Sequence, residues 1–397
     1  MKIVQIEDYF HPEAGYQINI LSKYMAKAGH DVVIVTASLE NCPDDTLSIF
    51  DKSNIEEKDA RYSSKYNVRI IRIPVKKVVF GRVLFDKKIF KIIADEKPDI
   101  LYVHGNDTLI GMQCLLKYRK WGLPMIMDSH MLEMASANKF NKIYRKAYKA
   151  IYTPIIVKNH IQVIRTQNDP YVEECLGIPL TQAPWISVGS DTLLFYPDKE
   201  KKEEFRKKNG IKADDFVVLY AGKLNENKGG MLLAESIKKK IASPKNVVFC
   251  IVGNTTDEYG EKVEKLFKES ENRILRFPTQ KYEDLAAFYR AADLAVFPRQ
   301  CSLSFYDVQA CGLPVLFEDN NVNIGRAQCG NAITFAAESV ESFKEKLAEF
   351  VNMDLSQLEL MGQHAKKYVE EEFDYKKIAD AYMDLIEAEA TRQKGLK

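Results

Sequence analysis

Two lysines five positions apart, Lys223 and Lys228, stand on a loop with the composition of a phosphate site. The loop follows a short apolar run at 216–220 and leads through Gly229 and Gly230 into a helical pattern. Lysines supply full charges, glycines let a ligand approach the backbone, and a helix N-terminus offers free N–H groups. A plain surface loop with solvated lysines has the same composition, because short phosphate-loop patterns have many false positives. Other motifs of the sequence are needed to distinguish a phosphate site from a plain surface loop.

A histidine at the end of a predicted strand is a second candidate for chemistry. His130 follows the apolar stretch 124–128, and His104 ends the preceding predicted strand in the same way. A lone histidine is more often structural, but the carboxyl end of a parallel strand is where doubly wound sheets place ligands. We therefore predict a functional role for His130, with His104 as the weaker candidate.

The elements that must position these residues alternate between strands and helices, which predicts a doubly wound α/β fold. A chain of 397 residues is too long for one hydrophobic core. The stretch 184–197 breaks the alternation with glycine and proline, and the alternation then restarts. We predict two tandem Rossmann-like domains facing a cleft, at 1–188 and 189–374, with the C-terminal helix 375–397 packing back on the first.

Short apolar or β-branched runs give the individual strands. Strands are expected at 3–6, 31–36, 68–73, 100–104, 124–128 and 161–165, and then at 216–220, 246–252, 274–277, 294–297 and 314–317. Helices are expected at 85–93, 109–118, 283–291 and from 340 onward. Residues 40–66 are polar and weakly periodic, so an excursion or a flexible loop is expected there.

The bulk composition is that of an ordinary globular protein, with 46% hydrophobic and 28% charged residues. A net charge of +1 provides no global field that would attract nucleic acid. The chain shows no signal-peptide pattern and no apolar run of membrane-spanning length, which predicts a cytoplasmic location. Seven cysteines without a C-x-x-C pair predict reduced thiols.

The motifs of the chain resemble those of the retaining glycosyltransferases of family 4 (group 1), which have the GT-B fold. The resemblance spans nearly the whole chain. Residues 12–15 are similar to the family's P-x-x-G-G loop, with Ala14 at the first glycine, and 29–32 to its G-H-x-V. Residues 188–197 are similar to N-G-V-D-x-x-x-F-x-P. The lysine loop resembles G-R-L-x-x-x-K-G, with Lys223 at the arginine position.

The resemblance implies a donor site in the second domain, with a departure in the family's E-x7-E segment. Asp307 falls on the second glutamate, which in the family holds the nucleotide ribose. Arg299 falls on the first glutamate, which contacts the donor sugar, so the charge is reversed. Either Arg299 faces an anionic donor sugar or a donor oxygen, or the loop is re-registered and another group replaces the glutamate. The backbone N–H groups of Ser302 and Leu303 can still serve a phosphate or sugar.

The resemblance also implies a reaction without a protein nucleophile. An acceptor hydroxyl attacks from the side that the nucleotide leaves, and a donor phosphate oxygen takes the proton. Lys223, Lys228 and the Gly15 backbone would stabilise charge on the leaving diphosphate, and His130 would orient the sugar or the phosphate. The donor is expected to be a nucleotide-diphosphate sugar, with UDP as the nucleotide and no cofactor. The chain contains no D-x-D motif, so no metal is expected.

The segment 139–165 is basic, contains no acidic residue, and interleaves cations with apolar and aromatic residues. Its cations are Lys139, Lys142, Arg145, Lys146, Lys149, Lys158 and Arg165. One interpretation is a helix that packs its apolar face on the sheet. The other is docking on an anionic membrane surface, which would suit a lipid-linked acceptor. We expect a glycan or lipid-linked acceptor, in surface polysaccharide or glycoconjugate synthesis, and a hexosyltransferase-type enzyme peripheral on the membrane.

Two other functions stay open. The non-hydrolysing sugar-nucleotide epimerases share the fold, but they need acid and base carboxylates that the sequence does not identify. A degenerate, non-catalytic subunit that binds a partner or a glycan would account for the altered E-x7-E segment. The retention of both lysines, Asp307 and His130 argues against it.

Overall fold

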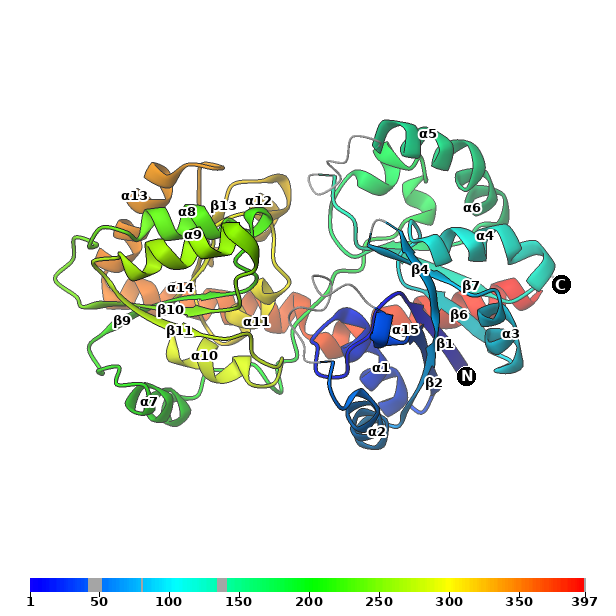
Figure 1. Ribbon diagram of the computed structural model, residues 1–397, viewed down its shortest axis with the longest axis horizontal. Coiled ribbons are helices and arrows are strands. Elements are labelled where there is room, and N and C mark those ends of the chain that lie inside the picture. The colour runs from blue at the N-terminus through cyan, green and yellow to red at the C-terminus, as the bar shows by residue number, and fades with distance from the viewer. Residues whose placement is uncertain (42–51, 80, 134–140, 396–397) are drawn as a thin grey trace. The chain divides into compact units, whose positions relative to one another are not determined.

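The computed structural model of the protein describes residues 1–41, 52–79, 81–133 and 141–395 (Figure 1). The chain forms two compact units, Met1–Val188 with Lys376–Lys397, and Gly189–Tyr375. Within the described ranges, none of the helices combines the length and the apolar composition needed to cross a bilayer.

The first unit is built on a parallel sheet of six strands. Their order is β3 (Val68–Ile73), β2 (Asp31–Ala37), β1 (Lys2–Glu7), β6 (Ile100–Val103), β7 (Met125–Ser129) and β8 (Val163–Arg165). The strands β2 and β6 are almost continuously apolar, as expected for parallel strands that are buried on both faces, whereas the edge strand β3 carries two arginines. The strand order reverses between β1 and β6, where sheets of this kind place ligands at the carboxyl edge.

Helices and a small hairpin complete the first unit. They are α1 (Gln17–Lys27), α2 (Ile55–Tyr66), β4 (Val75–Val79), β5 (Arg82–Phe85), α3 (Lys88–Asp95), α4 (Leu109–Trp121), α5 (Asn141–Ile151), α6 (Thr153–Asn159) and α15 (Tyr375–Gly395). Gln393 of α15 accepts the Met125 N–H at 2.8 Å and donates to the Met125 carbonyl at 2.9 Å, so α15 packs on β7.

Two expectations for this unit are wrong. The polar stretch 40–66 contains the helix α2 rather than only a loop, although 42–51 lies outside the described residues. The helix predicted from 85 begins at Lys88, because Phe85 ends the hairpin strand β5, which pairs with β4. The α2 helix buries few of its side chains, so it leaves no apolar period in the sequence.

The second unit repeats the doubly wound plan. Its parallel strands lie in the order β11 (Arg273–Phe277), β10 (Val247–Val252), β9 (Phe216–Ala221), β12 (Leu294–Phe297), β13 (Val315–Glu318) and β14 (Ala332–Phe335). Its helices are α7 (Lys199–Lys208), α8 (Gly230–Ser236), α9 (Asp257–Lys268), α10 (Leu285–Ala291), α11 (Ser304–Ala310), α12 (Asn321–Arg326), α13 (Val340–Asn352) and α14 (Leu355–Tyr368). The predicted fold class is confirmed. The strand β14 is not among the strands predicted from the sequence.

Short single turns connect several of these elements. They are η1 (Leu39–Asn41), η2 (Tyr171–Cys175), η3 (Leu180–Gln182), η4 (Glu226–Lys228) and η5 (Val369–Phe373). The turn η4 matters most for function, because it ends on Lys228 and leads directly into α8.

Candidate active site

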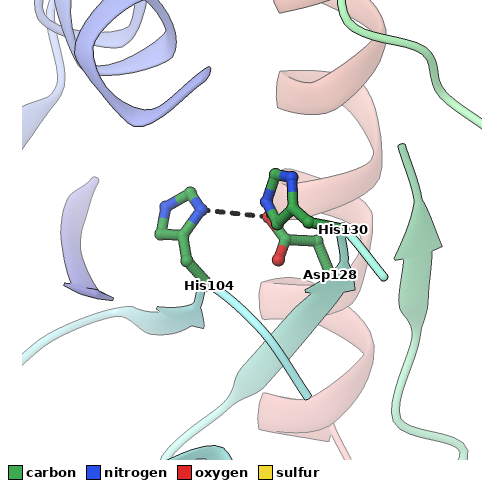
Figure 2. A group of neighbouring side chains, drawn as sticks. All are labelled: His104, Asp128 and His130. Atoms are coloured by element: carbon green, nitrogen blue, oxygen red, sulfur yellow. Dashed lines mark hydrogen bonds and ion pairs between the residues drawn. The ribbon is translucent and has the colours of Figure 1, made fainter. Parts of the chain in front are cut away.

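At the carboxyl edge of the first sheet, one buried carboxylate gathers two histidines (Figure 2). Asp128 Oδ2 lies 3.0 Å from His104 Nδ1 and 3.2 Å from His130 Nε2. The Tyr102 hydroxyl donates to the same oxygen at 2.7 Å, and the Gly105 N–H donates to Oδ1 at 2.7 Å. These four donors offset the cost of burying a carboxylate, which is high when the group is unpaired.

His130 is the exposed member of this cluster. Its side chain is 39% exposed, whereas the side chains of His104 and Asp128 have no exposed surface. Burial lowers the pKa of His130, but the Asp128 carboxylate raises it by more, with help from Glu7 and Asp107, to about 9. The ring is therefore an imidazolium at neutral pH and can donate an N–H to a sugar or phosphate oxygen.

His104, Asp128 and His130 are also close enough to share a metal ion, since their ligand atoms lie within 4.8 Å of one another. Imidazole and carboxylate groups are ligands of divalent transition metals. In this structure the same atoms are joined by hydrogen bonds, and the second nitrogen of His104, Nε2, lies 2.8 Å from Gln5 Oε1. The expected independence from metal stays a prediction.

Two carboxyl groups at the end of β1 belong to the same edge. Burial and, to a smaller extent, the neighbouring Asp8 raise the pKa of Glu7 to about 8. Burial also raises the pKa of Asp8 to about 6, although Arg82 lowers it. Glu7 is therefore mostly protonated at neutral pH and is a donor at this edge. The sequence signal for both groups is their place directly after an apolar strand.

Gly15 lies in the loop between β1 and α1, next to Tyr16, which begins the helix. The Tyr16 side chain does not cap α1, and the first turn of the helix holds no acidic residue. These features keep an anion site at this helix end chemically feasible. Contact between the Gly15 backbone and a diphosphate stays a prediction.

In the second unit, Lys228 crosses from η4 to the loop that follows β12. Its Nζ atom donates to the Cys301 carbonyl at 2.7 Å. Burial lowers the pKa of Lys228, and the nearby charges of Arg326 and Lys223 lower it as well. Three cations therefore stand close together where the sequence predicts two. The Cys301 and Ser302 carbonyls already compensate part of the repulsion among these cations, and a bound anion would compensate it further.

The glycine after Lys228 is explained by packing within the protein and not by the approach of a ligand to the backbone. Gly229 adopts φ +72, and a Cβ atom there would lie 2.9 Å from Arg299 Cβ and 3.1 Å from Pro298 Cβ. The close approach at Gly229 is therefore made by the chain itself, not by a ligand. The glycine allows the loop after β12 to pack against the lysine loop.

Arg299 is paired within the protein. Its guanidinium forms an ion pair with the Glu338 carboxylate and donates to the Glu226 carbonyl at 3.4 Å. A second carboxylate, Glu318, accepts the Gln300 N–H at 2.9 Å and the Glu338 N–H at 3.3 Å. Glu318 therefore holds both segments that carry the ion pair. Contact of Arg299 with an anionic sugar or a donor oxygen stays a prediction, and so does a re-registered loop. An anionic sugar would have to compete with Glu338 for the guanidinium.

The same loop carries the two backbone groups predicted to face the donor. The Ser302 carbonyl accepts from the Arg326 guanidinium at 2.7 Å. Leu303 is 39% exposed and directly precedes α11. Within the described ranges no acceptor is bonded to the N–H of Ser302 or of Leu303. Arg326 is a residue that the sequence analysis does not identify, since its role depends on a contact between separate loops.

Asp307 lies on α11 and is buried. Its Oδ1 atom accepts from the Ser190 hydroxyl at 2.8 Å and from the Tyr282 hydroxyl at 3.4 Å. Burial raises the pKa of Asp307 to about 7, although these two donors lower it. The carboxyl group is thus held near its titration midpoint at neutral pH, and its role toward a ribose stays a prediction.

The structure groups the predicted residues by unit. Lys223, Lys228, Arg299, Ser302 and Leu303 belong to two adjoining loops of the second unit, and Asp307 follows on α11. His130 and Gly15 belong to the carboxyl edge of the first unit's sheet.

Comparison with known proteins identifies relatives of both units. The family model for glycosyl transferases group 1 matches residues 201–368, and the model for glycosyltransferase family 4 matches residues 14–161. D-inositol 3-phosphate glycosyltransferase 1 of Catenulispora acidiphila is 29% identical over 230 residues, covering 54% of this chain and 54% of that protein. The chain spans about half the length of such D-inositol 3-phosphate glycosyltransferases.

A longer match and the solved structures agree with these models. The UDP-Gal:alpha-D-GlcNAc-diphosphoundecaprenol alpha-1,3-galactosyltransferase of Escherichia coli is 23% identical over 320 residues, covering 75% of this chain and 78% of that protein. Anabaena Alr3699/HepE, solved with UDP and glucose, superposes with a TM-score of 0.74 at 13% identity, covering 98% and 100% of the two chains. A glycosyltransferase from Rickettsia africae gives a TM-score of 0.75 at 13% identity, covering 98% of each chain. With a matching family model in each doubly wound unit, the chain belongs to the GT-B glycosyltransferases of family 4.

Proposed function

We propose that this glycosyltransferase moves a hexosyl group, with retention of anomeric configuration, from a UDP-sugar to a hydroxyl of a glycan or lipid-linked acceptor. The pathway would be synthesis of a surface polysaccharide or glycoconjugate. The relative from Escherichia coli is named for a UDP-linked donor and a diphosphoundecaprenol-linked acceptor, and HepE was solved with UDP. Both facts concern those proteins and support the choice of UDP and of a lipid-linked acceptor here.

The observation that carries the proposal is the gathering of Lys223, Lys228 and Arg326 beside the 299–303 loop. A leaving diphosphate gains negative charge in the transition state, and fixed cations stabilise that charge without reorganisation. Lys228 is held on a loop carbonyl, so it is already oriented before the donor binds. The N–H groups of Ser302 and Leu303 would add two neutral donors at the same place.

His130 would act from the first unit as a charged hydrogen-bond donor. Its ring would orient the donor sugar or a phosphate oxygen, and it would not take a proton, because it is already protonated at neutral pH. The acceptor proton would pass to a donor phosphate oxygen, so no protein base is required. Carboxylates that could bind acceptor hydroxyls, such as Asp8, lie on the same sheet edge.

The proposal is tested by a thermal-shift panel with UDP, GDP, ADP, CMP and dTDP. We expect UDP to raise the melting temperature by roughly 5–10 °C at a concentration of about 100 Kd. The shift should be the same in EDTA, because the cationic side chains are proposed to hold the diphosphate without a metal. If none of the nucleotides gives a shift, the donor site is absent and a non-catalytic subunit becomes the better hypothesis.

A membrane surface is proposed as the second partner, carried by the helix α5. Its tyrosines face the core, with Tyr148 fully buried and Tyr144 half-buried. Its isoleucines face out, with Ile143 70% and Ile151 49% exposed. The cations of the helix are Lys142, Arg145, Lys146 and Lys149, while Lys139 lies outside the described residues. Exposed apolar side chains between cations favour an anionic bilayer surface.

We expect the protein to co-sediment with vesicles that contain anionic lipid at low salt. Replacing Lys142 and Lys146 with glutamine should weaken binding by about 30-fold, since each lysine near a charged surface contributes about 1 kcal/mol. The same double change at Lys207 and Lys208, two exposed lysines of α7, is the matched control and should have little effect. Wild-type protein that stays in the supernatant at low salt would refute the membrane proposal.

A further inference from the structure

We infer that Asp128 is a positioning residue of the reaction, which holds the His130 ring in one orientation through an ion pair. The inference rests on the proposed role of His130, and it adds a residue that the family motifs named above do not include. The sequence places Asp128 two positions before His130 on the end of β7, so both side chains leave the same edge of the sheet.

The geometry separates the residue that touches a ligand from the residue that acts behind it. Asp128 has no exposed side-chain surface, whereas His130 is 39% exposed. Figure 2 shows His104 and His130 gathered at the Asp128 carboxylate. Because the carboxylate lies 3.2 Å from His130 Nε2, the opposite nitrogen of the ring, Nδ1, is the one turned away from it. Nδ1 makes only a long hydrogen bond of 3.5 Å to the Thr166 hydroxyl, which a substrate oxygen at a shorter distance would replace.

The position of the carboxylate is fixed from several sides. Tyr102 and Gly105 donate to it at 2.7 Å, from β6 and from the turn that follows. His104 donates at 3.0 Å, and its other nitrogen lies 2.8 Å from Gln5 of β1. A carboxylate bonded in this way has one rotamer and one place for its charge. Such a network specifies orientation better than a single hydrogen bond does.

Asp128 is the main source of negative charge around His130. The groups that raise the pKa of His130 are Asp128 of β7, Glu7 of β1 and Asp107 of the loop after β6. Glu7 contributes little charge at neutral pH, because its own pKa is raised to about 8. Burial would raise the pKa of Asp128, but His130 and His104 lower it well below its usual range. The carboxylate is therefore ionised throughout the physiological range and keeps His130 protonated.

The charge of His130 predicts how the rate of catalysis depends on pH. A base such as imidazole is charged below its pKa, so His130 stays cationic as the pH rises, up to about 9. Without the carboxylate, burial still lowers the pKa of the ring, so it should lose its proton at or below the unperturbed value of about 6.5. A neutral imidazole still donates one N–H, but a hydrogen bond from a charged donor is roughly twice as strong.

The test is Asp128→Asn, which preserves shape and removes the charge. Nitrogen-15 NMR of histidine-labelled protein, with His130 assigned through His130→Gln, should show a pKa of about 9 in wild type and a pKa no higher than about 6.5 in the variant. The kcat of the variant should fall about tenfold or more at pH 8, and the loss should become smaller as the pH is lowered.

The matched control is Asp215→Asn, which removes a carboxylate that is equally buried but belongs to the second unit and contacts Asn246 and Lys212. It should lower stability without moving the His130 titration. A general loss of stability therefore cannot imitate the expected result.

Three outcomes would overturn the inference. One is a His130 pKa that is the same in Asp128→Asn as in wild type. Another is a wild-type His130 that titrates near 6.5, a measurement that stands even if the variant does not fold. The third is one equivalent of bound metal in wild type that Asp128→Asn removes, because the three side chains would then be metal ligands. The titration needs no substrate, so it tests this inference separately from the proposed function. If the protein gives the expected NMR result but is inactive, the inference about Asp128 is supported and the proposed function is not.

Discussion

Replacing Lys228 with alanine is expected to lower kcat by about 10²–10³-fold, the usual cost of removing one preorganised group that stabilises developing charge. Lys228 is half-buried, its pKa is lowered by burial, and it is held on the Cys301 carbonyl, so water cannot replace it at the same point. The free energy of unfolding should change by less than about 1.5 kcal/mol, because only one hydrogen bond is lost. Transfer kinetics and urea denaturation measure the two effects separately.

The matched control is Lys238→Ala, which makes the same chemical change at an exposed lysine of the second unit that pairs with Glu269. It should leave both kcat and the shift induced by UDP unchanged. Lys223→Ala should fall between the two, because Lys223 is exposed but contributes to the positive charge at Lys228. Full activity in Lys228→Ala would mean that the diphosphate binds elsewhere.

The strands of both sheets could be predicted because parallel strands buried on both faces leave continuous apolar runs. Val247–Val252 and Asp31–Ala37 are clear examples, since nearly every residue in them is buried. The edge strand Ala332–Phe335 is short and only partly buried, so it leaves no such signal. The hairpin of β4 and β5 lies outside the main sheet and carries two adjacent exposed lysines, Lys76 and Lys77, which hide its alternation.

Candidate site residues can be proposed from the sequence where a strand end or a loop motif points to them, and not where a role depends on a partner far along the chain. His130 and Lys228 belong to the first kind. Asp128 belongs to the second, because three of its four donors come from Tyr102, His104 and Gly105 of the neighbouring strand and its turn. Arg299 likewise depends on Glu338, which lies 39 positions away. Spacing alone cannot show that its charge is paired.

Asp307→Asn is expected to stabilise the free protein above pH 7 and, at the same pH, to weaken its binding of UDP. Burial raises the pKa of Asp307 from 3.8 to about 7. For an acid whose pKa is higher in the folded state, ionisation costs stability: the cost is absent below about pH 4, grows between 4 and 7, and is complete above 7. At about 1.4 kcal/mol per pKa unit, it is at most about 4 kcal/mol. Asparagine avoids this cost and keeps an oxygen for Ser190 and Tyr282.

Urea denaturation at pH 5 and pH 8 measures the first effect, and calorimetric titration with UDP at pH 8 measures the second. Loss of a charged acceptor for ribose hydroxyls should weaken UDP binding by about 10–150-fold, equivalent to roughly 1.5–3 kcal/mol. Asp215→Asn is the control of opposite sign. Burial raises the pKa of Asp215, but the hydrogen bonds from Asn246 and Lys212, together with the charges of Arg273 and Lys212, lower it by more, so this variant should lose stability at pH 8.

If Asp307→Asn loses stability at pH 8 as Asp215→Asn does, the buried charge at 307 is not a cost and the ribose role loses its support. If Asp307→Asn gains stability and loses UDP affinity, the carboxylate at 307 lowers the stability of the protein and is required for its charge when a ligand binds. Such a trade is expected at a binding site and not in a structural core, where an uncharged residue of the same shape would be the more stable choice.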